Sequence, residues 1–128
     1  MDRVELDRVT RLTIGSVMKV HSSLGPGMLE GAYEVCLAYE LGRQGLRVDR
    51  QVEVPVTYEG LQVGVGYRMD LLVAGEVVVE LKTVEKLNAQ HRAQLLSYLR
   101  FGGRRVGLLL NFHALRLKDG IMRLVNDY

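Results

Sequence analysis

Hydrophobic residues recur every three to four positions in two stretches near the amino terminus, at about residues 4–22 and 28–42. On a helix this spacing gathers them on one face, so both stretches are predicted to be amphipathic helices. Gly25-Pro26-Gly27 separates the two stretches, and Gln44-Gly45 ends the second. The positions expected to face the core are Val9, Leu12, Ile14, Ser16, Val17, Met18, Val20, Leu29, Ala32, Tyr33, Cys36, Leu37 and Leu41.

The middle of the chain changes to short, valine-rich runs that are typical of β-strands. The first run ends near Pro55, which is expected to kink the strand or to place it at a sheet edge. Glu59-Gly60 then signals a hairpin turn. Two further strands are predicted at 67–73 and 77–82, with Ala74-Gly75-Glu76 as the tight turn between them.

A third helix is predicted from Asn88, whose side chain can cap it, to about Phe101, where Gly102-Gly103 closes it. A buried strand is expected at 106–110, and the tail contains a turn at Asp119-Gly120 with one short strand. The order of elements, α-α-β-β-β-α-β, predicts a mixed α/β (α+β) fold.

The composition is that of one soluble globular domain spanning residues 1–128, with 48% hydrophobic residues, 25% charged residues and a net charge of +2. No apolar run is long enough to cross a membrane, and the amino-terminal segment is charged and amphipathic rather than a signal sequence. A cytoplasmic location is therefore expected. The single cysteine, Cys36, excludes an internal disulfide, and the lack of a Cys/His cluster argues against structural zinc.

Asp70, Glu80 and Lys82 are the strongest candidates for chemistry. Because side chains alternate along a strand, Glu80 and Lys82 share a face, and an antiparallel hairpin can bring Asp70 to the same side. Two acids beside a lysine suit a divalent cation in metal-assisted phosphodiester cleavage. The alternative is a solvated charged face on an edge hairpin. The β-branched run Val77-Val78-Val79 favours a buried strand instead, whose charges need partners.

Further candidates lie on the predicted helices. His91, Gln94 and Tyr98 form one stripe of the third helix, from which Gln94 and Tyr98 could pack over the acids, whereas His91 is expected to lie at the surface. Glu30 lies in the first turn of the second helix. The helix dipole alone accounts for an acid there, and an additional site ligand is the alternative.

A run of five cations without any acid extends through the third helix and could neutralise phosphates, although a solvated helix face explains it equally well. The cations are Lys86, Arg92, Arg100, Arg104 and Arg105.

Several segments together resemble one known family. Gly27-Met28-Leu29-Glu30-Gly31-Ala32-Tyr33 spells Gly-x-x-Glu-x-x-Tyr. With Val20-His21, Gly66-Tyr67-Arg68-Met69-Asp70, Val79-Glu80-Leu81-Lys82 and Gln94-Leu95-Leu96-Ser97-Tyr98-Leu99, the chain closely resembles the GxxExxY proteins. These are small bacterial and archaeal proteins assigned to the PD-(D/E)XK nuclease superfamily.

The resemblance implies a restriction-endonuclease-like core, in which a central mixed four-stranded sheet is flanked by helices. It implies that Asp70 and Glu80 bind the metal ion, that the backbone carbonyl of Leu81 completes the metal shell, and that Lys82 is the catalytic lysine. The other catalytic residues implied are Glu30, Gln94 and Tyr98.

These roles describe a nuclease that depends on Mg²⁺ or Mn²⁺ and acts on nucleic acid, with DNA expected over RNA by analogy with the family. Two alternatives stay open: an inactive nuclease-fold module that binds nucleic acid or a protein partner, and a subunit that becomes competent only as a homodimer. The intact set of two acids and a lysine favours an enzyme, because buried charges cost desolvation energy that a binding module has no reason to bear.

Overall fold

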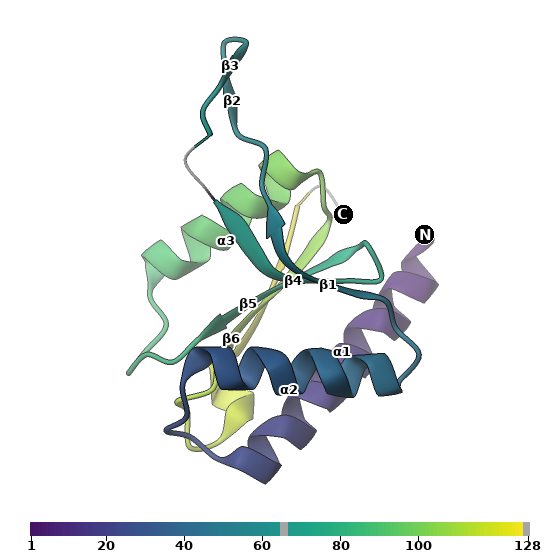
Figure 1. Ribbon diagram of the computed structural model, residues 1–128, viewed down its shortest axis with the longest axis vertical. Coiled ribbons are helices and arrows are strands. Elements are labelled where there is room, and N and C mark those ends of the chain that lie inside the picture. Colours follow the sequence, from purple (N-terminus) through teal and green to yellow (C-terminus); the bar gives the residue numbers. More distant parts are fainter. Residues whose placement is uncertain (65–66, 127–128) are drawn as a thin grey trace.

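A five-stranded mixed sheet forms the centre of the computed structural model, which describes residues 1–64 and 67–126 (Figure 1). The strand order is β1-β4-β5-β6-β7; β5 and β6 run parallel, and the other neighbours are antiparallel. The strands are β1 (Val48–Glu53), β4 (Arg68–Val73), β5 (Val77–Lys82), β6 (Val106–Asn111) and β7 (Ile121–Val125).

The mixed α/β class and the predicted strand positions are confirmed, and the sheet has one strand more than the expected four. The additional strand is β7, the short strand expected in the tail, which pairs with β6 along most of its length. A short 3₁₀-helix, Leu117–Gly120, precedes it at the predicted turn. Gly66, which opens the segment around Asp70, lies outside the described residues.

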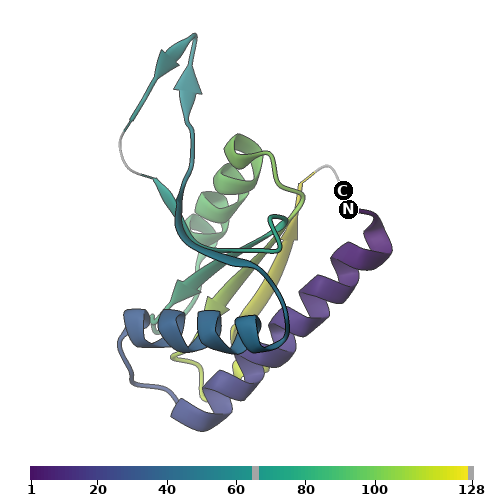
Figure 2. The same cartoon turned by 45° about the vertical axis from the view of Figure 1, so that its right-hand side comes forward.

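Helices cover both faces of the sheet. The helices α1 (Arg3–Leu24) and α2 (Glu30–Arg43) pack on one face, and α3 (Ala89–Gly102) packs on the other (Figures 1 and 2). Side chains of β5 alternate between the two cores: Val77, Val79 and Leu81 face α1 and α2, whereas Val78 faces α3. The predicted burial of β5 on both faces is confirmed. No helix within the described residues is long and apolar enough to span a membrane.

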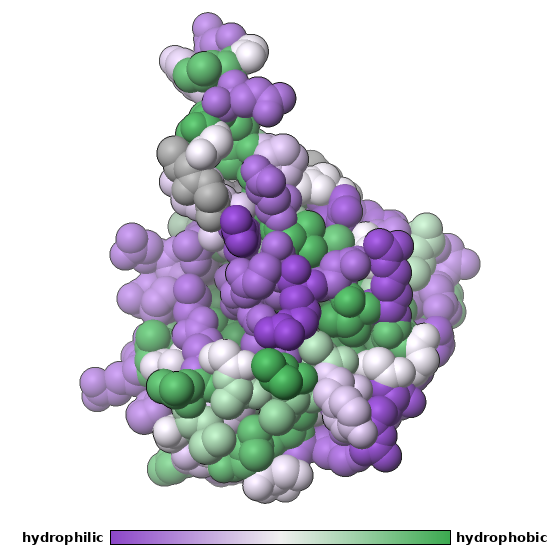
Figure 3. Space-filling view, in the orientation of Figure 1, coloured by the Kyte–Doolittle hydropathy of each residue, from purple (hydrophilic) through white to green (hydrophobic). Residues whose placement is uncertain are grey.

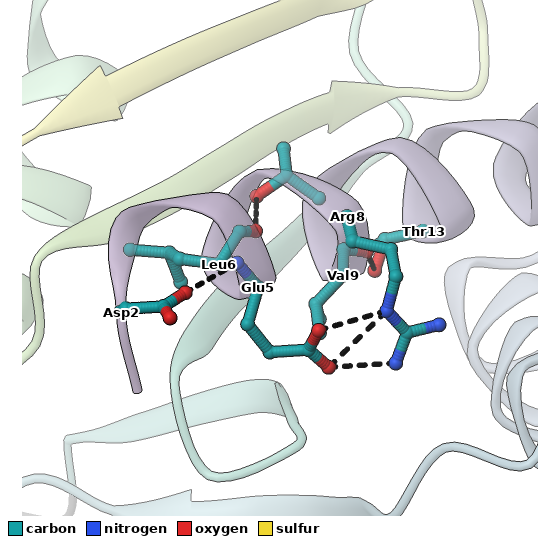
Figure 4. Close-up of polar contacts among 7 residues, drawn as sticks. Asp2, Glu5, Leu6, Arg8, Val9 and Thr13 are labelled. Atoms are coloured by element: carbon teal, nitrogen blue, oxygen red, sulfur yellow. Dashed lines mark hydrogen bonds and ion pairs between the residues drawn. The ribbon is translucent and has the colours of Figure 1, made fainter.

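The first helix is capped by Asp2, whose side chain accepts a 2.8 Å hydrogen bond from the backbone N–H of Glu5 (Figure 4). Its buried face differs in part from the expected one. Thr10 and Thr13 are buried because their hydroxyls donate to backbone carbonyls four residues earlier in the helix. Met18, predicted to face the core, is 48% exposed.

The second helix begins two residues later than predicted, and Leu29 is 83% exposed at its N-cap instead of buried. The reason is Tyr33, whose hydroxyl donates to the carbonyl of Gly25 and accepts from the N–H of Met28 at 3.1 Å. The buried ring of Tyr33 also stacks on Phe112, with 4.3 Å between ring centroids. This side chain therefore holds the connection between the helices out of helical conformation and sets the position of the helix start.

A two-stranded ribbon of β2 (Thr57–Tyr58) and β3 (Leu61–Gln62) projects beyond the sheet (Figure 1). Its turn is at Glu59-Gly60, as predicted, where both residues have positive φ. The main sheet stops at Val54, whose N–H donates to the carbonyl of Tyr67, because the next residue, Pro55, has no N–H to continue the ladder. In Figure 3, hydrophobic and hydrophilic residues are mixed along the ribbon, and hydrophobic residues gather lower down, over α1 and α2.

The third helix has the predicted cap. The side chain of Asn88 accepts from the N–H of His91, and the His91 side chain accepts from the N–H of Asn88. His91 thus has a structural role. Gly103 ends the helix with a φ of 67°, in the left-handed region where glycine has no steric penalty.

The hydroxyl of Tyr33 is expected to stabilise the fold without taking part in chemistry. Tyr33→Phe keeps the stacking on Phe112 but leaves the carbonyl of Gly25 and the N–H of Met28 without this partner. We expect the free energy of unfolding to fall by about 1–3 kcal/mol, measured by urea denaturation. Tyr39→Phe, at a tyrosine that is 67% exposed on the same helix, is the matched control. Equal stability of the two variants would contradict the anchoring role.

Candidate active site

The antiparallel hairpin of β4 and β5 opens at the end away from its turn. Backbone pairing runs from Val73 opposite Val77 to Leu71 opposite Val79 and then stops. Asp70 and Glu80 are the next residues in this register. Both acids therefore lie just beyond the last paired residues, where the two strands separate.

Two crossed hydrogen bonds take the place of the missing backbone rungs. The N–H of Asp70 donates to Glu80 Oε1 at 2.9 Å, and the N–H of Leu81 donates to Asp70 Oδ2 at 2.8 Å. Each carboxylate therefore satisfies a backbone donor that would otherwise pair with a carbonyl of the neighbouring strand. The same two bonds fix both acids at one end of the hairpin.

Burial and mutual repulsion disfavour the ionised forms of the two carboxyl groups. Glu80 is only 4% exposed, and burial, followed by repulsion from Asp70, raises the pKa of Glu80 to about 8. Burial likewise raises the pKa of Asp70. Without a cation, the pair keeps a proton near neutral pH, because a buried carboxyl group next to a second, half-buried one resists ionisation.

Lys82 lies one pleat beyond Glu80 on the same strand. Its Nζ donates to Gln94 Oε1 on α3 at 3.2 Å, and its charge acts to lower the pKa of both Asp70 and Glu80. Within the described residues, Lys82 forms no direct ion pair with either acid. The ammonium group is thus near the carboxyl groups but held beside them by the glutamine.

Tyr98 comes from the same helix, one turn after Gln94, and is 7% exposed. Burial is the main cause of its raised pKa, and the negative charges of Glu80 and Asp70 add to it. Its phenol therefore lies within electrostatic range of both acids. The structure brings together the two acids of the hairpin, the lysine and the two residues of the α3 stripe.

Glu30 reaches the same region from the first turn of α2. Its carboxyl group is close enough to Thr83, Asp70 and Lys82 for these residues to affect its pKa. Burial is the largest cause of its raised pKa, and repulsion from Asp70 is the next. Its position at the helix start thus combines the expected dipole interaction with proximity to the acids.

Three residues next to the acids were not predicted from the sequence to belong to the site. Glu34 is buried next to Asp70 and accepts from Arg50 at 2.8 Å and from Gln51 Nε2 at 2.7 Å. Gln51 also lies 3.5 Å from Asp70 Oδ1 and has a φ of 54°. Non-glycine residues in this region of φ are strained, and such strain is concentrated at functional sites. The available signal was the position of Glu34 one turn after Glu30, on the same helix face.

The basic run does not form one patch. Lys86 and Arg92 are exposed near the start of α3, at the same end of the sheet as Lys82. Arg105 lies at the opposite end, beside the hairpin turn, where it contacts Glu76 at 3.8 Å and donates to the carbonyl of Met1. Arg105 is therefore not placed to meet a ligand at the acids.

The donor set fits a magnesium-like ion better than a closed structural site. Within residues 1–64 and 67–126, no three His, Cys, Asp or Glu side chains are grouped as metal ligands. The available donors are the remaining oxygens of Asp70 and Glu80, together with the carbonyl of Leu81. That carbonyl points toward β4, because the N–H of the same residue donates to Asp70. Mg²⁺ typically binds one or two carboxylates and keeps several waters.

A mixed sheet flanked by helices, with two acids and a lysine where its central hairpin opens, defines a restriction-endonuclease-like protein. The model of the PD-(D/E)XK nuclease superfamily matches residues 7–124, so the chain belongs to this superfamily. Its nucleases act on nucleic acid and generally use divalent metal ions. No curated protein and no solved structure gives a match.

The raised pKa of Glu80 predicts that the protein becomes less stable as the pH rises toward 8, the opposite of what a carboxyl group with a lowered pKa would cause. In EDTA, the folded protein keeps the Glu80 proton up to about pH 8, whereas a carboxyl group at the ordinary value of 4.5 loses it much earlier. The unfolded state then binds fewer protons between these values, so the free energy of unfolding falls as the pH rises through this window. Glu80→Gln, which imitates the protonated acid, should flatten this decline in urea denaturation measured from pH 5 to 8.

The control is Glu53→Gln, at an exposed acid on β1, which should keep the wild-type slope. Millimolar Mg²⁺ or Mn²⁺ should stabilise the wild type most at the upper end of the window, where the acids ionise most readily. Parallel curves for the wild type and Glu80→Gln would show that Glu80 is not held protonated.

Proposed function

We propose that this protein is a nuclease dependent on Mg²⁺ or Mn²⁺ that hydrolyses phosphodiester bonds, with DNA as the preferred substrate. The observation that carries the proposal is the pair of half-buried Asp70 and buried Glu80, fixed by crossed hydrogen bonds where β4 and β5 separate. A pair that resists double ionisation in the free protein is suited to receive a divalent cation, because the cation offsets the repulsion.

In this proposal Asp70 and Glu80 hold the ion, with the carbonyl of Leu81 as a third protein donor. The ion, when bound, would lower the pKa of a coordinated water and offset negative charge on the scissile phosphate. Gln51 and Glu34 are positioning residues, since they contact Asp70 or each other and not the reacting groups. They keep the carboxylate of Asp70 directed toward Leu81 instead of toward solvent.

Lys82 supplies the positive charge of the site. In the free protein its Nζ is held by Gln94, close to the acids but not paired with them. From this position it can orient the attacking water or stabilise the charge that develops on the phosphate. Gln94 sets the lysine position, and Tyr98 closes the α3 side of the site.

Glu30 lies on the α2 side, where its raised pKa makes it a candidate for proton transfer or for an additional water-mediated contact to the ion. The Gly-x-x-Glu-x-x-Tyr segment that contains it supports membership of the GxxExxY group within the superfamily. Its Tyr33 anchors the helix start from which Glu30 projects. The proposal also includes a cytoplasmic location and, from the alternative left open by the sequence, a homodimer.

The proposal is tested with purified protein and labelled single-stranded and duplex DNA and RNA, with EDTA, Mg²⁺ or Mn²⁺. Cleavage should require the metal. Asp70→Asn should abolish the effect of the metal, because it removes a ligand charge. Lys82→Ala should lower turnover by about 10²- to 10³-fold, the typical loss for a preorganised charge-stabilising donor, and should change DNA affinity much less.

Lys118→Ala, at an exposed lysine of the 3₁₀-helix, is the matched control and should retain full activity. Metal-independent binding of nucleic acid without cleavage of any form would instead identify an inactive binding module. An absence of both binding and cleavage would point to a protein partner.

A further inference from the structure

A pocket of about 240 Å³ lies along α3. Its walls are Val56 and Tyr67, from the segments that connect the projecting ribbon to the sheet, and residues of α3. The α3 residues are Gln94, Ser97, Tyr98 and Phe101. The pocket thus lies where the ribbon leaves the body of the molecule.

The pocket and the candidate active site share two residues. Gln94 lines the pocket and also accepts from Lys82 Nζ at 3.2 Å. Tyr98 lines it too, and its raised pKa reflects in part the negative charges of Glu80 and Asp70. The pocket and the candidate active site are therefore neighbours. One nucleotide could place its base in the pocket and its phosphate at the acids.

The lining has the character of a binding site for a flat, weakly polar ring. Tyr67 and Tyr98 lie against each other with 6.4 Å between ring centroids and their ring planes tilted by 58°, and Phe101 adds a third aromatic side chain. The amide of Gln94 and the hydroxyl of Ser97 offer hydrogen-bonding groups at the rim. The volume is below the range of roughly 300–1,000 Å³ that is usual for drug-sized ligands, so a single ring system suits it better than a larger molecule.

Positive charge lies next to the aromatic residues. Arg68 follows Tyr67 at the start of β4 and is exposed. Arg100 is also exposed, and its guanidinium lies 4.9 Å from the centroid of the Phe101 ring. Aromatic rings that accept bases, next to cations that meet the backbone, form the usual arrangement for binding single-stranded nucleic acid.

We propose that this pocket binds one unpaired nucleobase of a single DNA strand whose adjacent phosphate lies at Asp70 and Glu80. A base within a duplex is stacked on both faces and cannot enter, so the pocket selects single-stranded or frayed DNA. This inference rests on the proposed nuclease function and specifies its substrate class.

The test is the affinity for a fluorescein-labelled single-stranded DNA oligonucleotide, measured by anisotropy in Ca²⁺ or EDTA to prevent cleavage. Tyr67→Ala should weaken binding by about 5- to 150-fold, the range for the loss of one base–aromatic stack. Tyr67→Phe keeps the ring and should bind like the wild type. Tyr67 is 44% exposed, so its truncation leaves the core intact, and Tyr39→Ala, at an exposed tyrosine of α2, is the control.

Binding to a blunt duplex should be weaker than to the single strand and insensitive to Tyr67→Ala. Unchanged single-strand affinity of Tyr67→Ala, equal losses for single strand and duplex, or no DNA binding at all would overturn the proposal. A cleavage assay with Mn²⁺ separates it from the proposed function. Tyr67-dependent binding without cleavage retains the pocket and rejects the nuclease, whereas equal cleavage of both forms by wild type and Tyr67→Ala rejects the pocket alone.

Discussion

The structure depends most on the way in which Asp70 and Glu80 meet at the open end of the central hairpin. Their carboxylates accept from the backbone N–H groups of Leu81 and Asp70, so the strands can separate without leaving buried donors unpaired. The cost is a pair of acids that burial and mutual repulsion hold away from full ionisation. The helices on both sides of the sheet contribute further charged and polar side chains that interact with this pair.

Those groups give the site an excess of negative charge. Four carboxyl groups lie close enough for repulsion between neighbouring ones, whereas the cationic side chains that interact with them are Lys82 and Arg50. Glu30 itself is affected by repulsion from Asp70 and Glu34. Such a concentration of acids repels a phosphodiester unless a cation lies between them. This charge balance agrees with the divalent metal ions that nucleases of the superfamily generally use.

Local patterns predicted much of this arrangement. The hairpin turn at Ala74-Gly75-Glu76 and the two-residue alternation of strands were enough to place Asp70 beside Glu80, and the α3 stripe followed from helical spacing. Contacts between distant segments had no such signal. Gln51 meets Asp70 only because β1 pairs with β4, and Leu29 is exposed because the Tyr33 hydroxyl holds the preceding loop. Nothing local in the sequence specifies either contact.

The position of Lys82 helps to distinguish an enzyme from a binding module. A module that only holds nucleic acid gains affinity from exposed cations and loses it from buried acids, which are costly to the fold and repulsive to phosphate. Here the acids are fixed by backbone donors, and the lysine is held beside them by Gln94 instead of neutralising them. Keeping opposite charges close but unpaired lowers stability, and this cost is typical of sites that stabilise charge developing during a reaction.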